Sequence, residues 1–446
     1  MCIRDRQISD DSLTWTVKLR DDATFTDGKP VTAEDVAFTY EKVKESTSIN
    51  DLTMMKSCEA VDDHTVVFHM VKPYSTFAYT MTVVGIMPKH AYSDQYGLNP
   101  IGSGRYKLLQ WDKGQQAIFV ANEGYYGDSP EMEKVTFLFM SEDAALAAAK
   151  AGQVDVAYTA ATFSDQNIKG MHLESYASVD NRGFSMPVTK PGKKTVEGYE
   201  IGNAVTSDLA IRKALAYGID RKALADTVLN GHGTVAYSVC DGLPWFNEDS
   251  KIDYNMKKAK TILDEAGWVM GKDNIRIKNG TKAEFTLMYP ASDSVRQAIA
   301  AQTANLVKEL GIHVIPKGVG WDEVDEKVYS TPMLYGWGAN NPMEIYNLYY
   351  SHVPYNKASY SNPVLDQYMN EALEATNLED SYLFWKKAQW DGSTGITPEG
   401  DYPWVWLLNI DHLYFVKDGL KIAEQKVHPH GHGWSVVNNV DQWYWE

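Results

Sequence analysis

The stretch TWTVKLRDDATFTDGKPVTAEDVAFTYEKV, residues 14–43, holds a strand, a turn and a helix in close succession. Apolar and polar side chains alternate along its start, which is the period-two pattern of a half-buried strand. The apolar positions are Leu13, Trp15, Val17 and Leu19. Asp27-Gly28-Lys29-Pro30 follows, which is typical of a turn because glycine is free to take a positive φ and proline fixes its own φ. The first half of the stretch therefore predicts a strand that ends in a turn.

A helix is expected directly after this turn. Thr32 with Asp35 three residues later is a variant capping box, in which two side chains satisfy free backbone N–H groups at the helix start. Val36, Tyr40 and Val43 then fall on one helical face. The second half of the stretch predicts a capped helix, and the whole stretch therefore predicts one strand-turn-helix unit.

The amino-acid sequence of this stretch resembles that of a known family. LRDDATFTDGKPVTAEDVAFTYEKV is similar to the signature of family 5 extracellular solute-binding proteins, the peptide- and nickel-capturing subunits of ABC importers. Four more segments resemble that family in the same order, and together they extend over nearly the whole chain. They are NPIGSGRY (99–106), LAIRKALAYGIDRKALADTVL (209–229), AKTILDEAGW (259–268) and YGWG (335–338).

The resemblance implies an α/β protein with a type II periplasmic-binding-protein fold. In that fold two α/β lobes surround a cleft, and a small accessory α/β domain is added in the peptide-binding branch. Applied to this chain, the resemblance gives an accessory domain over residues 1–98 and a first lobe over 99–205. The second lobe covers 206–410, and residues 411–446 return to the first lobe.

Periodicity predicts further elements within the lobes. Strands are expected at 65–68, 117–121, 135–140 and 284–289. Ser141 and the alanine run after it predict a helix, and the strand before it and the apolar residues after it suggest a parallel βαβ unit. Residues 293–310 form an amphipathic pattern that ends at Gly311 and precedes another strand, which indicates doubly wound α/β structure in the second lobe.

Composition limits the function classes. The 446 residues carry a net charge of −17, which argues against nucleic-acid binding because a polyanion needs a basic face. Cys2, Cys58 and Cys240 give neither a disulfide framework nor a CxxC metal motif, and a Cys58–Cys240 bridge is not expected. Aromatic residues make up 12% of the chain, which suits both a large core and a pocket for varied small molecules.

The start of the chain departs from the family. Residues 1–6 match no part of it and are interpreted as an artefact, and no apolar signal segment is present. Because family members are exported, we expect the chain to be N-terminally truncated and the protein to be periplasmic or extracellular and associated with the cell membrane. The sequence has no run of about 18 apolar residues, so we expect no membrane span. Cys2 is not interpreted as a lipidation site, and the sequence does not separate a lipid-anchored protein from a free one.

The segment around Trp337 is the leading candidate for ligand binding. Gly338 and Ala339 follow a short apolar strand, and ligands of α/β sheets bind beyond the carboxyl ends of strands. The resemblance places an aspartate that pairs with a peptide α-ammonium at the position of Asn340, with Asn341 beside it. A neutral amide forms a weaker bond to an ammonium than a carboxylate does. The substitution favours a blocked, neutral or anionic ligand; the alternative is a plain turn without ligand contact.

Three other side chains are candidates. Trp321 lies where the resemblance places a tryptophan of the pocket, and burial is its alternative. Arg182 is suited to hold a carboxylate, and an ion pair with Asp180 is its alternative. Tyr346 begins a helical stripe with the tyrosines three and four residues later, which is more often core than pocket.

His428, His430 and His432 alternate in a Gly- and Pro-rich segment, and imidazole is a good ligand for nickel or zinc. No acidic or cysteine side chain lies within the motif. We therefore expect no dedicated metal site and interpret these histidines as weak candidates, with a structural turn as the preferred interpretation.

The sequence predicts a binding protein without cofactor or catalytic residues, since it contains none of the GxSxG, HExxH or P-loop motifs. The expected function is capture of short peptides or similar-sized solutes by hinge closure and delivery to a membrane permease of an ABC importer. The expected state is a monomer. The alternatives are a nickel or metal-chelate binding protein of the same family and a hydrolase on the same scaffold.

Overall fold

The N-terminal strand and helix form where the sequence predicts them. The structure is a computed structural model, and it describes residues 3–46, 52–430 and 434–446. In β2 (Thr14–Leu19) every second side chain is buried. In α1 (Ala33–Glu45) the capping box is present, and Asp35 Oδ2 accepts the Thr32 N–H at 2.9 Å. The predicted apolar face of α1 is buried at Val36 and Tyr40.

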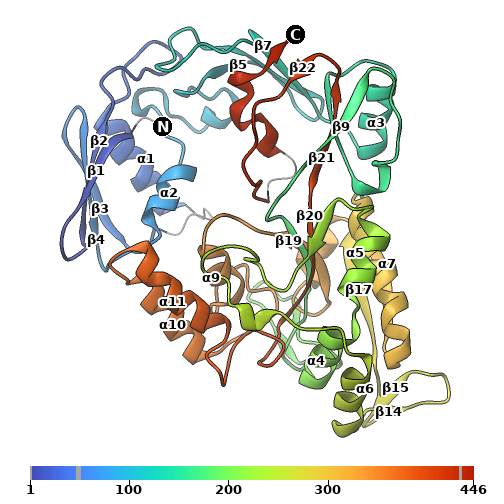
Figure 1. The fold of residues 1–446 in the computed structure, drawn as a ribbon. Helices are drawn as coiled ribbons and strands as arrows, with labels where there is room; N and C mark the ends of the chain where they lie inside the picture. Colours follow the sequence, from blue (N-terminus) through green and yellow to red (C-terminus); the bar gives the residue numbers. More distant parts are fainter. Residues whose placement is uncertain (1–2, 47–51, 431–433) are drawn as a thin grey trace.

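These elements belong to an N-terminal unit built on a four-stranded antiparallel sheet in the order β1-β2-β4-β3. The remaining elements of this unit are β1 (Ile3–Ile8), β3 (Met55–Asp62), β4 (Thr65–Met70) and α2 (Phe77–Val83). Its core continues into α10 (Pro363–Leu373) and α11 (Leu378–Gln389), which lie beside it in Figure 1. The unit therefore shares its core with a segment that is distant in sequence.

The first lobe contains two antiparallel sheets of three strands each. One is the meander β5 (Tyr106–Asp112), β6 (Gln116–Ala121) and β7 (Lys134–Leu138); the other has the order β8-β21-β9. The strands of the second are β8 (Val156–Thr159), β9 (Met171–Tyr176) and β21 (His412–Lys417).

The helix of this lobe, α3 (Glu142–Lys150), begins at Ser141 as predicted. The predicted parallel βαβ unit around it is wrong, because β7 pairs with β6 and β8 pairs with β21, in separate antiparallel sheets.

The second lobe is organised around a six-stranded sheet in the order β13-β20-β10-β19-β17-β18. The strands are β10 (Asn181–Ser185), β13 (Gly233–Val235), β17 (Glu284–Pro290), β18 (His313–Val319), β19 (Met333–Trp337) and β20 (Trp404–Ile410). The unit β17, α7 (Ser294–Leu306), β18 is parallel, as the sequence predicts. The sheet as a whole is mixed, because β10 pairs antiparallel with both β19 and β20.

Helices cover this sheet and link it to the N-terminal unit (Figure 1). The remaining α-helices are α4 (Leu209–Gly218), α5 (Arg221–Val228), α6 (Met256–Glu265), α8 (Trp321–Lys327) and α9 (Met343–Tyr349). The short strands are β11 (Lys193–Lys194), β12 (Glu200–Ile201), β14 (Val269–Met270), β15 (Arg276–Lys278), β16 (Thr281–Lys282), β22 (Leu420–Lys421) and β23 (Tyr444–Trp445). The 3-10 helices are Lys89–Ala91, Tyr96–Leu98, Ala161–Phe163, Glu248–Ser250, Val307–Leu310 and Trp434–Gln442.

The chain crosses between the two lobes at a hinge, where β9 continues into β10 and β20 continues into β21 (Figure 1). The segment at 427–430 runs beside the first crossing: Val179 N–H donates to His428 O at 2.8 Å, and His428 N–H donates to Ala177 O at 2.9 Å. The pairing of β10 places residues 181–185 in the sheet of the second lobe, whereas the sequence assigned them to the first. The strand pairing thus favours a boundary near the hinge, before residue 181.

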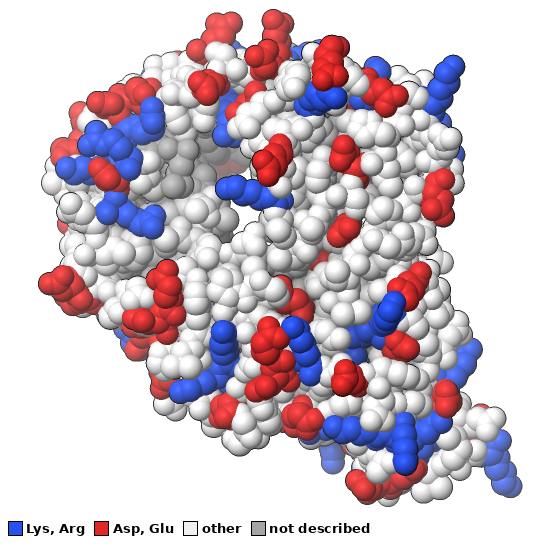
Figure 2. All heavy atoms as spheres, in the orientation of Figure 1, with Lys and Arg blue, Asp and Glu red and all other residues white. Residues whose placement is uncertain are grey.

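The surface is mixed in charge, and basic and acidic side chains are interspersed on the face shown in Figure 2. That face is hollowed between the N-terminal unit and the lobes. Cys58 and Cys240 are both buried and free, as expected. Among the described helices, none is long and apolar enough to cross a membrane.

Gly338 brings the end of β19 against the hinge. Its φ is +126°, and a Cβ at this position would overlap the carbonyl group of Val179. On its other side, His430 N–H donates to Gly338 O at 2.6 Å. Only glycine combines this backbone conformation with such close packing. Its role in the fold is therefore close contact between the second lobe and two hinge segments.

Replacing Gly338 with alanine should lower the free energy of unfolding by at least about 2 kcal/mol, since the new methyl group is both strained and overpacked. Gly320 is a matched control, because its φ is −79° and a methyl group added there would meet no atom within 4 Å. Thermal or urea unfolding of Gly338→Ala and Gly320→Ala checks this. Equal stabilities of the two variants would contradict the assignment.

Candidate ligand-binding site

A cavity of about 510 Å³ lies against the hinge. Its lining comes from the second lobe and from the hinge segments. The residues are Ser178, Val179, Thr234, Val235, Tyr237, Asp241, Gly242, Leu243, Phe246, Lys251, Asn340, Asn409 and Val427. This volume is within the usual range of small-molecule sites, and apolar, aromatic and polar groups are mixed in the lining.

Strand register explains why polar side chains gather here. Thr234, Asn409, Asn181 and Trp337 are successive partners across β13, β20, β10 and β19. Directly paired residues point to the same face of a sheet. Thr234 and Asn409 reach the cavity, and Asn409 Nδ2 donates to Val235 O at 3.2 Å. Both amide atoms of Asn181 and the indole nitrogen of Trp337 are buried without a hydrogen-bond partner among the described residues.

The segment predicted around Trp337 divides into two parts. Asn340 lines the cavity, and ligand contact by its side chain stays a prediction. Asn341 instead accepts the Met343 N–H through Oδ1 at 3.0 Å, which is the turn arrangement at the start of α9. The Trp337 ring contacts Tyr355, with centroids 5.4 Å apart, and packs against the core of the N-terminal unit.

The other two aromatic candidates lie outside this lining. Trp321, at the start of α8, is 50% exposed and stacks on Tyr335 with centroids 6.2 Å apart. Tyr346 on α9 stacks on Tyr350 at 4.4 Å, and both pack against the core, as the alternative interpretation of the stripe expects. A role for Trp321 or Tyr346 in ligand contact stays a prediction.

Sequence reasoning missed Tyr237, Asp241, Phe246 and Lys251. They lie in the segment between β13 and α6, which carries no motif, and Asp241-Gly242 has the composition of an ordinary turn. Only the fold shows that this segment forms a wall of the cavity.

Asp241 has an unusual environment. Its carboxylate accepts N–H groups of Tyr237 at 3.1 Å and of Ser238 at 3.0 Å. Burial raises the pKa of Asp241 to about 7, although these hydrogen bonds and the charge of Arg221 oppose the shift. Within the described residues Asp241 makes no ion pair. The cavity therefore contains a carboxyl group that is desolvated and has no direct ion-pair partner among the described residues.

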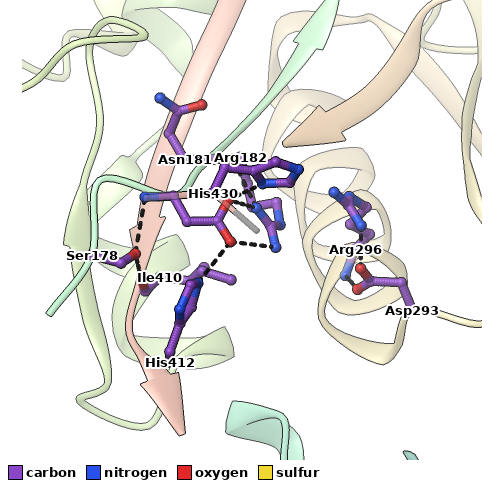
Figure 3. Close-up of polar contacts among 9 residues, drawn as sticks. Ser178, Asn181, Arg182, Asp293, Arg296, Ile410, His412 and His430 are labelled. Atoms are coloured by element: carbon purple, nitrogen blue, oxygen red, sulfur yellow. Dashed lines mark hydrogen bonds and ion pairs between the residues drawn. The ribbon is translucent and has the colours of Figure 1, made fainter. Parts of the chain in front are cut away.

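The hinge holds a second cluster, centred on Asp180 (Figure 3). Asp180 forms an ion pair with Arg182 from β10, and His412 Nε2 of β21 lies 3.0 Å from its Oδ2. His430 Nδ1 lies 2.7 Å from Oδ1. Burial alone would raise the pKa of Asp180, but Arg182 and the two histidines hold it well below its ordinary value. Arg182 is thus paired as its alternative interpretation expects, and a ligand role for it stays a prediction.

A second ion pair lies next to this cluster. Arg296 of α7 pairs with Asp293, and a Cβ on Gly336 would overlap both the Arg182 and the Arg296 guanidinium groups. Burial and the nearby charge of Arg182 lower the pKa of Arg296. Glycine at position 336 leaves room for two guanidinium groups on this face of β19.

The candidate histidines are part of the hinge. His428 is buried, with Nδ1 lying 3.1 Å from His412 Nδ1 and Nε2 lying 3.0 Å from Gln425 Oε1. Burial, and secondarily the charge of His412, lower the pKa of His428 to about 4. His432 lies outside the described residues. Among those that are described, no three His, Cys, Asp or Glu side chains are grouped as a metal site would require.

Comparison with known proteins identifies a family. Residues 3–358 match the bacterial extracellular solute-binding proteins, family 5 Middle. Protein XP55 of Streptomyces lividans is 32% identical over 436 residues, which cover 92% of this chain and 76% of that protein. The oligopeptide-binding protein AppA of Bacillus subtilis is 30% identical over 393 residues, which cover 81% and 70%.

Solved structures confirm the predicted type II periplasmic-binding-protein fold. NikZ from Campylobacter jejuni in complex with Ni(L-His) aligns with a TM-score of 0.86 at 24% identity, over 99% of this chain and 90% of that one. AppA from Bacillus subtilis in complex with a nonapeptide aligns with a TM-score of 0.78 at 24% identity, over 100% and 90%.

The pKa of His428 predicts how stability depends on pH. The folded pKa of about 4 lies below the ordinary value of 6.5. Neutral His428 therefore makes its full contribution to the free energy of unfolding above pH 6.5. As the pH falls from 6.5 to 4, the free energy of unfolding decreases by about 3 kcal/mol, because the unfolded chain binds the proton more readily than the folded one. We expect His428→Asn to remove this part of the pH dependence. Urea unfolding of the wild type and the variant at several pH values checks this. The same dependence of the free energy of unfolding on pH in both proteins would contradict it.

Removing the Asp180 carboxylate should leave Arg182 buried and unpaired. We expect Asp180→Asn to lower the free energy of unfolding by about 3–5 kcal/mol. Asp22→Asn is the matched control, since Asp22 pairs with Arg20 on the surface, and its melting temperature should change little. If both variants lose the same free energy of unfolding, the buried pair of Asp180 and Arg182 contributes no more to stability than the surface pair.

Proposed function

The chain belongs to the bacterial extracellular solute-binding proteins of family 5, and on this premise we propose that it captures a short peptide or a solute of similar size for an ABC importer. The hinge cavity is the observation that carries the proposal. Its lining includes Asn340, the residue at which the sequence predicts a ligand contact. The bound solute would be delivered to a membrane permease.

The mechanism we propose is capture by hinge closure. Two strand crossings and the segment at 427–430 connect the lobes, and the cavity lies directly against them. A ligand that contacts the second lobe and the hinge at once stabilises the arrangement in which these parts are close. Such contacts shift an open–closed equilibrium toward the closed state.

A peptide fits the polar groups near the cavity. Asn340 and Asn409 offer amide donors and acceptors in the lining, and the unpartnered amide of Asn181 lies in the same register row. Peptide bonds carry both kinds of group, and buried polar atoms are normally satisfied. The similarity to AppA, named an oligopeptide-binding protein, points in the same direction.

The second candidate is a nickel or metal chelate. A nickel-binding periplasmic protein of Escherichia coli is 26% identical over 69% of this chain. Since the described residues offer no grouping of three metal ligands, a metal would have to arrive with most of its own ligands. A free metal ion is therefore the less favoured cargo.

The family is one of binding proteins, and we propose that this chain has no catalytic role. A hydrolase would need a nucleophile or a pair of acidic groups in the cavity. Ser178 donates its hydroxyl to Ile410 O, and Asp241 is the single carboxylate among the described lining residues. We propose further that the protein acts as a monomer outside the cytoplasmic membrane. It would be associated with that membrane either through a lipid anchor or, as a free protein, through the permease.

A thermal-shift panel tests the function. It should hold di- to pentapeptides, their N-acetylated forms, and Ni²⁺ with and without L-histidine. A ligand at a hundred times its dissociation constant adds about 2.7 kcal/mol and raises the melting temperature. We expect a shift with peptides, reduced in Asn340→Ala but unchanged in Asn305→Ala, which alters an exposed asparagine on α7.

A shift only with Ni²⁺ plus histidine would replace peptide capture with chelate capture. No shift with any member of the panel would contradict the proposed ligand class. If the ligand-induced shift falls equally in Asn340→Ala and Asn305→Ala, the ligand site does not lie in this cavity.

A further inference from the structure

We propose that Asp241 binds a cationic group of the ligand, so that the solute carries a protonated amine. This inference rests on the proposed function and specifies its substrate class. It also moves the acidic contact away from position 340, where the resemblance would place it, to a segment of the second lobe between β13 and α6.

Asp241 lines the cavity, and two backbone N–H groups bind its carboxylate. Both oxygens accept the Tyr237 N–H, each at 3.1 Å, and Oδ2 also accepts the Ser238 N–H at 3.0 Å. A carboxylate has about four lone-pair positions, so these bonds leave acceptor capacity for a ligand. Among the described lining residues Asp241 is the only acidic one.

The neighbouring charged groups do not neutralise it. Lys251, at the cavity wall, forms an ion pair with Glu248 at 2.6 Å. Arg221 of α5 donates to Trp406 O, Ala216 O and the Tyr402 hydroxyl, each at 2.8 Å. The other titratable neighbours are Cys240 and Tyr402, whose pKa values burial raises, so both are neutral near pH 7.

An ammonium group satisfies what this site lacks. It brings a positive charge in direct contact and N–H donors, and charge-assisted hydrogen bonds of this kind are about twice as strong as neutral ones. The aromatic rings of the lining already have cations of the protein beside them, since the Arg221 guanidinium lies 5.6 Å from the Tyr237 ring centre and Lys251 Nζ lies 5.5 Å from that of Phe246. The carboxylate is therefore the group that a ligand ammonium would contact. Asn340 can accept one further hydrogen bond. A peptide with a free amino terminus or a lysine side chain has the required group.

The alternative is that Asp241 only holds its own loop together through the Tyr237 and Ser238 N–H groups. The two roles differ in their consequences. A loop-holding carboxylate affects stability and all ligands alike, whereas a ligand-binding carboxylate discriminates by ligand charge. It also releases a proton when a cation binds, since its pKa of about 7 leaves it partly protonated near neutral pH.

Isothermal titration calorimetry of the whole protein tests the proposal. The probes are a peptide with a free amino terminus, its N-acetylated form, and the acetylated form with an added lysine. We expect Asp241→Asn to weaken binding of the cationic probe roughly 10- to 100-fold and of the neutral acetylated probe less than about twofold. The lysine probe shows whether the α-ammonium or a side-chain amine is recognised.

Proton release is the second readout. At pH 7 the wild-type protein should release about half a proton on binding a cationic probe, measured from the enthalpies in two buffers. The acetylated neutral probe should release none. Asp22→Asn is the matched control, because it removes a surface carboxylate outside the cavity lining and leaves Asp241 and Lys251 in place, and proton release should persist.

If Asp241→Asn does not fold, Asp241→Glu keeps the charge, and the wild-type comparison of probes still applies. Equal affinities for the cationic and neutral probes, or no proton release from the wild type, would overturn the Asp241 assignment while peptide capture stands. Failure of all probes to bind would overturn the proposed function and this inference with it.

Discussion

The buried carboxylate of Asp180 is the constraint on which the hinge depends. It lies between β9 and β10, and it contacts Arg182 on β10, His412 on β21 and His430 in the C-terminal segment. A carboxylate without these partners would not be tolerated at 1% exposure. One side chain thus connects three parts of the chain at the hinge, and Ser178, Val179 and Val427 near these contacts form one side of the cavity.

The glycines of β19 belong to the same arrangement. Gly336 leaves space for the guanidinium groups of Arg182 and Arg296, and Gly338 lets the strand end approach Val179 and His430. Sequence reasoning interpreted glycine here as room for a ligand. In the structure that room is filled by the hinge itself, and Asn340 beyond it lines the cavity. The glycines therefore serve the packing of the strand against the hinge.

Local patterns were sufficient where the determining contacts are local. The capping box of Thr32, the strand at Trp15 and the parallel unit of β17 and β18 each depend on neighbours a few residues away, and each formed as predicted. The βαβ unit around α3 failed because strand partners are chosen by tertiary pairing: β8 pairs with β21, more than 250 residues later. The inclusion of β10 in the second lobe is likewise a long-range choice.

The acidic group of the cavity lies at a different sequence position from the one that the family resemblance implies. Position 340 carries an amide where the resemblance expects a carboxylate, and considered alone this change argues against a cationic ligand. The fold brings Asp241, about a hundred residues earlier in the chain, to the same cavity, where it has no direct ion pair among the described residues. Electrostatic recognition depends on the total charge that faces a ligand rather than on the sequence position that supplies it. Loss of the acid at one position and presence of an unpaired acid at another are therefore compatible with one ligand chemistry.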